Sequence, residues 1–151
     1  MSILVFKNKT VLIKAGPTRE AIDPIRYISN HSSGKMGYVI AEAFLQQGAN
    51  VVLVKGPVNL QLQHPNPKLI PVITAFEMYI ACRFHFEECD IAVFAAAEAD
   101  YKSEVICENK IKKAGDDLYI KFVKNRDIAF EFGQVKKENQ LSIGFAPETN
   151  D

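Results

Sequence analysis

The chain has 151 residues, of which 48% are hydrophobic and 24% charged, a length and composition that suit one globular domain with a buried core. Basic and acidic residues balance at 18 each, which argues against nucleic acid or an anionic membrane as a partner recognised through net charge. Neither a signal-peptide pattern nor a membrane-spanning apolar run occurs, and the 3 cysteines are an odd number, so we expect a cytoplasmic protein with reduced thiols.

Strand patterns alternate with helical patterns along the chain. Apolar, β-branched runs predict strands over residues 10–15, 50–54, 69–73, 90–97, 118–123 and 141–146. Helical spacing predicts helices from about residue 35 to Gly48, from the capping box Thr74/Glu77 to about Glu87, and over 127–137. Glycines, prolines and polar residues predict loops over 16–24, 56–67 and 101–117. This order predicts one α/β domain over residues 1–151, a doubly wound, mostly parallel, Rossmann-like sheet with helices on both faces.

Ligands of such sheets bind beyond the carboxyl ends of the strands, so the loops after Ala15, Ala97 and Ala146 belong to the candidate site. The stretch 30–37 (NHSSGKMG) joins them, because glycines that admit a close ligand, hydroxyls and a helix start suit a phosphate. It is neither a Walker A loop nor a dinucleotide fingerprint, whose glycine spacing it lacks. A helix start that is merely loosened by glycine stays open as an alternative.

A second group of residues also favours a nucleotide. The end of the 90–97 strand, Ala95 to Ala97, is small enough to admit a flat ring, and Asp100 after it could accept from sugar hydroxyls. The basic cluster Lys110 to Lys113 follows in the next loop. A carboxylate, lysines and a glycine loop at one sheet edge indicate a nucleoside triphosphate, although a solvated turn could explain the lysines alone.

Two other kinds of site are weaker. The spacing of Cys82, His85 and Cys89 resembles metal ligation, but no fourth ligand is near, so we expect structural cysteines. Lys55 ends the second strand, where it could face the 2′-phosphate of NADP, but no Tyr-x-x-x-Lys pair accompanies it. An NADP oxidoreductase therefore stays a minor alternative.

Five segments in order resemble one known family: residues 16–20 (GPTRE), 23–37 (DPIRYISNHSSGKMG), 99–101 (ADY), 110–113 (KIKK) and 144–145 (GF). They look like the phosphopantothenate–cysteine ligase (phosphopantothenoylcysteine synthetase) domain of bacterial coenzyme A biosynthesis, over Lys9 to Thr149. The family's domain continues beyond position 151 with further triphosphate-binding lysines, so the resemblance implies a C-terminally truncated chain. It concerns only the ligase half of a bifunctional flavoprotein, so no flavin is expected.

The resemblance implies that CTP and Mg²⁺ activate 4′-phosphopantothenate as an acyl-cytidylate, which cysteine then attacks. It also implies a homodimer formed around the Lys110 cluster and the 118–123 strand. Asn30 and Lys110 are the expected catalytic residues, and no metal-binding residue is assigned. The expected nucleotide site consists of Gly16, Ser32, Gly34, Gly37, Ala96, Asp100, Lys110, Asp127, Ile128, Ala129 and Phe145.

Four residues depart from the family's usual pattern. Glu98 stands where a small apolar residue is usual, Arg126 replaces a proline, Pro147 replaces an alanine, and Lys14 replaces a small hydroxyl residue. These departures leave a second hypothesis open, a non-catalytic nucleotide-binding or regulatory module derived from the ligase.

Overall fold

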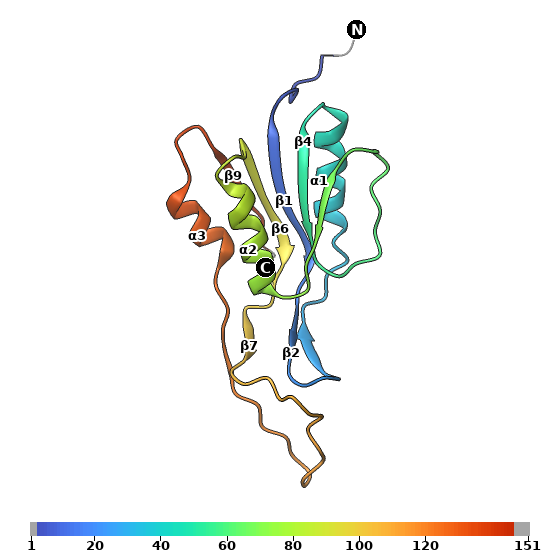
Figure 1. Cartoon of the computed structure of the whole chain (residues 1–151), viewed down its shortest axis with the longest axis vertical. Coiled ribbons are helices and arrows are strands. Elements are labelled where there is room, and N and C mark those ends of the chain that lie inside the picture. Colours follow the sequence, from blue (N-terminus) through green and yellow to red (C-terminus); the bar gives the residue numbers. More distant parts are fainter. Residues whose placement is uncertain (1–2, 147–151) are drawn as a thin grey trace, which may run out of the picture.

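The computed structural model describes residues 3–146, and its centre is a five-stranded sheet. The strand order is β5-β4-β1-β6-β9, and every neighbouring pair is parallel. The strands are β1 (Thr10–Pro17), β4 (Asn50–Lys55), β5 (Lys68–Pro71), β6 (Ile91–Ala97) and β9 (Leu141–Gly144) (Figure 1). The predicted parallel α/β fold is confirmed.

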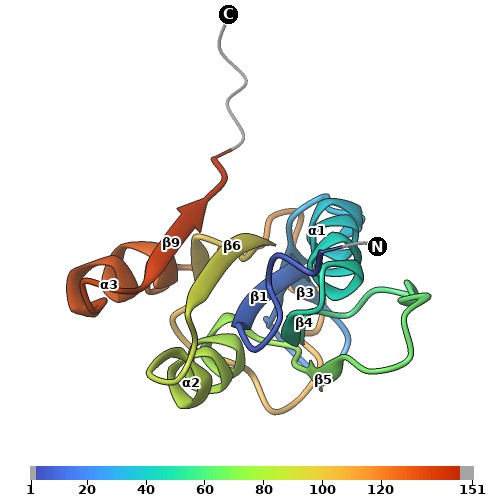
Figure 2. The ribbon, with the colours of Figure 1, turned by 90° about the horizontal axis from the view of Figure 1, so that it is seen from above.

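Helices cover both faces of this sheet. The helix α1 (Lys35–Gln46) lies on one face, and α2 (Ala75–Phe86) and α3 (Ile128–Val135) lie on the other (Figure 2). Because side chains alternate along a strand, Leu12 of β1 packs toward α2 and α3, while Val11 and Ile13 pack toward α1. Two apolar cores result, and the doubly wound arrangement is confirmed.

The helix ends follow the signals in the sequence. Thr74 accepts from the Glu77 N–H, and the Glu77 side chain accepts in return from the Thr74 N–H, so the capping box forms. Gly48, with φ of +88°, follows the end of α1. The predicted termination of α1 at this glycine is confirmed.

The loop predicted over residues 16–24 is wrong in its first part. β1 continues through Pro17, and β2 (Arg19–Ala21) pairs antiparallel with β3 (Tyr27–Ser29). The prolines that indicated a loop fall where no ladder N–H is needed, at the end of β1 and in the turn of this hairpin. The hairpin continues β1 below the main sheet (Figure 1).

The strand predicted over residues 118–123 is also mostly wrong. Only β8 (Phe122–Lys124) forms, antiparallel to β7 (Tyr101–Ser103), which lies in the predicted polar loop. Residues 104–121 make a long arm that projects from the layered body (Figure 1). Residues 118–121 have the alternating pattern of a strand, but β8 begins only at Phe122. The Lys121 carbonyl accepts from the Glu104 N–H at 3.0 Å, where the pairing of β7 with β8 ends. Within residues 3–146, no helix has both the length and the apolar character to cross a membrane.

Candidate functional site

The candidate site lies at the carboxyl ends of β1 and β6. From β1 the chain moves to β4 and β5 on one side, and then crosses to β6 and β9 on the other. This reversal makes a topological switch point, where ligands of open α/β sheets bind. The register places Gly16 beside Ala96, so two residues of the expected nucleotide site are neighbours on adjacent strands.

The start of α1 lies directly against the end of β1. A Cβ on Gly34 would lie 3.2 Å from the Gly16 Cα, and one on Gly37 would lie 2.3 Å from the Ala15 Cβ. Gly34 also has φ of +75°, a conformation that glycine adopts without strain. Gly37 is buried against β1, where it allows close packing of the helix on the strand. Its predicted contact with the nucleotide stays a prediction and could be made only by its backbone.

The amino end of α1 has the features of an anion site. No side chain accepts at its N-cap Gly34, and the first turn holds no acidic residue. Two long contacts precede it, Gly34 N–H to Ser32 Oγ and Lys35 N–H to Ser33 Oγ, both 3.3 Å. The positive end of the helix dipole therefore faces the switch point without a counter-charge from the helix itself.

Asn30 connects this segment to β6. Its Nδ2 donates to the Glu98 carbonyl at 3.0 Å and to the Ala97 carbonyl at 3.4 Å. The N-cap of α1 is Gly34, so Asn30 does not cap that helix. Its carboxamide instead joins the segment before α1 to the backbone at the end of β6.

Two residues that the sequence did not single out hold the chain after β6. Thr18 Oγ1 accepts from the Ala99 N–H at 3.0 Å, and Asn125 Nδ2 donates to the Ala99 carbonyl at 2.8 Å. The Asn125 N–H also donates to the Asp100 carbonyl at 2.8 Å. These bonds fix the backbone that presents Asp100, whose side chain is exposed. Thr18 and Asn125 lie 81 and 26 positions from Ala99 in the sequence, so no short motif predicts these contacts.

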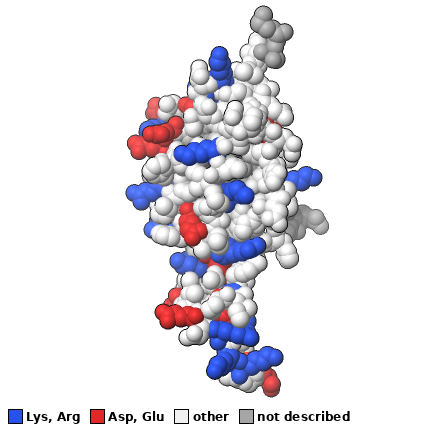
Figure 3. All heavy atoms as spheres, turned by 45° about the vertical axis from the view of Figure 1, so that its right-hand side comes forward, with Lys and Arg blue, Asp and Glu red and all other residues white. Residues whose placement is uncertain are grey.

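The predicted basic cluster is fixed by the β2–β3 hairpin. The buried Asp23 carboxylate accepts from the N–H groups of Ile25, Arg26 and Ile111 and pairs with the Arg26 guanidinium. Burial opposes ionisation of Asp23, but the backbone N–H groups of Ile25, Ile111 and Arg26 and the Arg26 charge outweigh it and lower its pKa to about 2. Asp23 thereby holds Ile111 and the adjacent exposed Lys110. Basic side chains gather at this lower end of the molecule (Figure 3).

The residues predicted around α3 have different environments. Asp127 caps the helix, its Oδ1 accepting from the Phe130 N–H at 3.0 Å, and Ile128 is fully buried in the core. Only the backbone of Ile128 is therefore available to a ligand. Ala129 packs at the edge of the same core as Ala96, and half-exposed Phe145 follows β9.

Two of the residues that depart from the family's usual pattern, Lys14 and Glu98, form an ion pair with each other. They are 84 positions apart in the sequence. The Arg126 guanidinium lies over the Tyr79 ring, 4.6 Å from its centre, and 3.5 Å from Glu131. Pro147, the remaining departure, lies outside the described residues.

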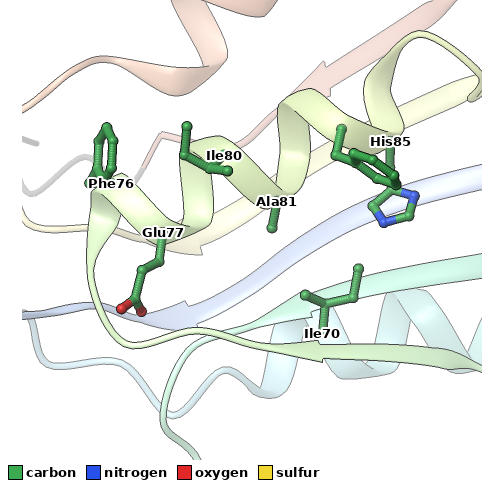
Figure 4. A pocket seen from close by; sticks show the side chains of 7 residues that line it. Ile70, Phe76, Glu77, Ile80, Ala81 and His85 are labelled. Atoms are coloured by element: carbon green, nitrogen blue, oxygen red, sulfur yellow. The ribbon is translucent and has the colours of Figure 1, made fainter.

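Two hollows lie beside α2. An open apolar groove of about 450 Å³ runs between α2 and β5, lined by Ile70, Phe76, Glu77, Ile80, Ala81, Phe84 and His85 (Figure 4). A more polar hollow of about 230 Å³ lies beside the start of α2 and includes Lys102, Lys124 and Arg126. The groove lacks the convergent polar groups of a small-molecule site.

The cysteines of the metal-like pattern belong to the core. Burial raises the pKa of Cys82 to about 12 and that of Cys89 to about 11, which keeps both thiols protonated. His85 lies instead at the groove of α2 (Figure 4). Within residues 3–146, no three His, Cys, Asp or Glu side chains come together as a metal-binding group.

Fold and geometry together define a Rossmann-like α/β domain with its candidate site at the topological switch point. Residues 6–151 match the family described as "DNA/pantothenate metabolism flavoprotein C-terminal domain". The chain belongs to this family.

Individual relatives agree with the family match. The "Coenzyme A biosynthesis bifunctional protein CoaBC" of Haemophilus influenzae is 52% identical over 141 residues, 93% of this chain and 35% of the relative. The Escherichia coli K12 protein of the same name is 47% identical over 148 residues, which cover 96% of this chain and 36% of that relative. A crystal structure of the C-terminal domain of CoaBC superposes with a TM-score of 0.81 at 38% identity, covering 99% of this chain and 69% of that one. The chain thus spans about a third of the length of the curated relatives.

Proposed function

We propose that this domain carries the phosphopantothenate–cysteine ligase activity of coenzyme A biosynthesis and uses CTP. The observation that carries the proposal is the approach of the uncapped α1 start to the ends of β1 and β6, with Asn30 bridging them. Membership of a family whose relatives are named for coenzyme A biosynthesis supports the same substrate class.

The proposed reaction has two steps. A carboxylate oxygen of 4′-phosphopantothenate attacks the α-phosphorus of CTP, and pyrophosphate leaves with the electrons of the broken P–O bond. The amine of cysteine then attacks the acyl carbon, CMP leaves, and the amine loses a proton. The attacking carboxylate is already ionised at neutral pH, so the first step needs positioning and charge stabilisation more than a general base.

The residues at the switch point suit these tasks. Gly16, Ser32 and Gly34 form the phosphate side, where helix N–H groups offset negative charge. The Ala96 backbone meets the base edge and Asp100 takes the ribose. Lys110 binds the base or supports the intermediate. Asp127, Ile128, Ala129 and Phe145 complete the nucleotide pocket, Ile128 through its backbone.

Asn30 is the residue that we propose holds the acyl-cytidylate. One of its two contacts is long, 3.4 Å to the Ala97 carbonyl, and such a bond is weak. The N–H that makes it is free to donate to the intermediate, while the 3.0 Å bond to Glu98 keeps the side chain in position.

Mg²⁺ fits the proposal as an ion that arrives with the triphosphate. Magnesium in nucleotide sites is commonly held by phosphates, waters and one or two carboxylates, and Asp100 is an exposed carboxylate. The ion would neutralise phosphate charge.

The proposed setting is cytoplasmic and the proposed assembly a homodimer that forms through the arm. The arm exposes large apolar side chains on both of its limbs: Val105, Ile106, Leu118 and Tyr119. Such a surface favours a protein partner over solvent.

Pyrophosphate release before cysteine is added tests the function. The full-length protein is mixed with Mg²⁺, 4′-phosphopantothenate and either CTP or ATP. We expect one pyrophosphate per site with CTP and much slower release with ATP, since an unmatched buried base edge costs about 1–3 kcal/mol. CTP binding without pyrophosphate release would favour the non-catalytic module, and preference for NADPH over CTP would favour the oxidoreductase.

A further inference from the structure

The turn that joins β6 to β7, residues 97–99, is held by side chains from β1, from the residue after β1 and from the segment before α1. Asn30 donates to the carbonyls of Ala97 and Glu98, and Thr18 accepts from the N–H of Ala99. Lys14, in the middle of β1, pairs through its Nζ with Glu98 Oε1. The turn therefore has a charged anchor in addition to its neutral hydrogen bonds.

This charged anchor is buried. The side chains of Lys14 and Glu98 are 3% and 14% exposed, and Glu98 Oε2 has no hydrogen-bond partner among residues 3–146. The ammonium lies 5.5 Å from the centre of the Phe94 ring. Cys82 of α2 lies close enough for both charges to act on its pKa, which burial raises to about 12. A buried ion pair adds little net stability, but either charge alone in such surroundings is unfavourable.

The connection to Asn30 is direct. The residue whose carboxylate pairs with Lys14 also supplies the carbonyl that accepts the 3.0 Å bond from Asn30. The next two residues, Ala99 and Asp100, are held separately by Thr18 and Asn125. Loss of the ion pair should therefore move the Asn30 contact while leaving the ribose side of the site in place.

We propose that Lys14 and Glu98 are positioning residues that act through Asn30: their ion pair fixes the 97–99 turn so that Asn30 is oriented toward the reacting groups. This inference rests on the proposed function, in which Asn30 holds the acyl-cytidylate. Both side chains are largely buried, so the proposal gives neither of them a contact with the reacting atoms.

The first test separates rate from affinity in the full-length protein. Lys14→Met and Glu98→Gln each leave one buried charge alone, so we expect each to slow pyrophosphate release at least about tenfold with CTP affinity nearly unchanged. The double variant Lys14→Met/Glu98→Gln has no lone charge but still lacks the ion pair, so its pyrophosphate release should stay slow. Recovery of the parent rate in the double variant would show that a lone charge, not loss of the pair, slows the reaction, and would overturn the proposal. Rates within twofold of the parent in both single variants, or CTP affinity that falls in parallel with the rate, would overturn the proposal.

A matched control accounts for stability. Gln140 is also buried and joins the end of α2 to the start of β9, donating to the Phe86 and Cys89 carbonyls at 2.7 and 2.9 Å. It lies near the amino end of β9, away from the switch point. Gln140→Leu should lower the free energy of unfolding without slowing pyrophosphate release. Equal slowing in this variant would assign the effect of the pair to stability alone.

A double-mutant cycle tests the route through Asn30. If the pair acts only through that residue, Glu98→Gln in an Asn30→Ala background should slow the reaction no further. A further tenfold loss would show an independent role and contradict the proposal.

A measurement that does not depend on catalytic activity tests the positioning role separately from the proposed function. Hydrogen exchange of the Asn30 side-chain amide, followed by ¹⁵N NMR, should speed up at least about tenfold in Glu98→Gln and not in Gln140→Leu. Unchanged exchange would overturn the positioning role. A parent protein that releases no pyrophosphate but shows this exchange effect would refute the ligase proposal while the positioning role stands.

Discussion

Asn30 shows most clearly how single residues set the chemistry of this site. Its amide nitrogen points at two carbonyl oxygens of the turn after β6, in a position where a carboxylate would meet only acceptors. With Gly34 as the N-cap, a helix-capping role for Asn30, which aspartate would fill equally well, does not apply.

We therefore expect Asn30→Asp to lose acyl-cytidylate formation. Loss of one donor to a developing charge costs about 3 kcal/mol, or roughly 100-fold in rate, and repulsion from the carbonyls and phosphates adds to it. CTP affinity, measured by calorimetry, should change by less than about tenfold, because the added charge lies beside the intermediate rather than along the whole triphosphate.

The control for this variant is Asn139→Asp, which adds the same charge at an exposed position before β9. It should behave like the parent. Full pyrophosphate release in Asn30→Asp would show that its amide has no part in forming the intermediate.

Gly37 sets the distance between α1 and β1. A methyl group there would lie 2.3 Å from the Ala15 Cβ, so Gly37→Ala should lower the free energy of unfolding by about 1–3 kcal/mol through overpacking. Gly133→Ala in α3 is the matched control, since nothing lies within 4 Å of its added Cβ, and should stabilise by about 0.5–1 kcal/mol. Urea unfolding measures both, and equal shifts would refute the packing role of Gly37.

At the scale of elements, the β2–β3 hairpin supports the site through its turn. Asp23 joins the turn of the hairpin to Ile111 of the arm, so its ionised carboxylate connects two elements that do not pair as strands. The Cys107 N–H adds a second connection, donating to the Ile22 carbonyl at 3.0 Å. The basic cluster owes its position to these connections.

The connection through Asp23 predicts a pH dependence. The pKa of Asp23 is lowered from 3.8 to about 2, so its contribution to stability is present above pH 4 and is lost as the pH falls toward 2. Asp23→Asn should be less stable than the parent at pH 7, and the difference should shrink between pH 4 and 2. The difference in urea midpoint measures it; a difference that does not change with pH would contradict the assigned role.

Local patterns were enough to predict the parallel strands and the capping box of α2, because β-branched runs and cap residues act over a few positions. The start of α1 at about residue 35 was also predicted, but the positive φ of Gly34 before it was not. The β2–β3 hairpin was missed because three-residue strands leave too short a pattern. Contacts between distant positions, such as Lys14 with Glu98 or Asp23 with Ile111, leave no spacing signal at all.

At the scale of the whole molecule, the arm is the feature that a single layered domain does not explain. It extends below the sheet and exposes large apolar side chains, Tyr119 among them at 89% (Figure 1). The predicted 118–123 strand does not form over 118–121, so in the proposed dimer we expect the apolar side chains of the arm, rather than a strand edge, to make the contact.

We expect dimers in sedimentation velocity at micromolar concentration. Tyr119→Glu should shift the population to monomer by placing a charge among the apolar side chains of the interface. Val135→Glu, which changes an exposed apolar residue of α3, is the control and should remain dimeric. A parent protein that is only monomeric would refute the dimer.

A crystal structure of the protein with CTP and Mg²⁺ tests the proposed nucleotide site most directly. The account predicts the phosphates at the start of α1 beside Gly16 and Gly34, the cytosine edge on the backbone of Ala96, and the ribose at Asp100. CTP bound instead in the hollow beside Lys102 and Lys124, or in the groove between α2 and β5, would contradict it.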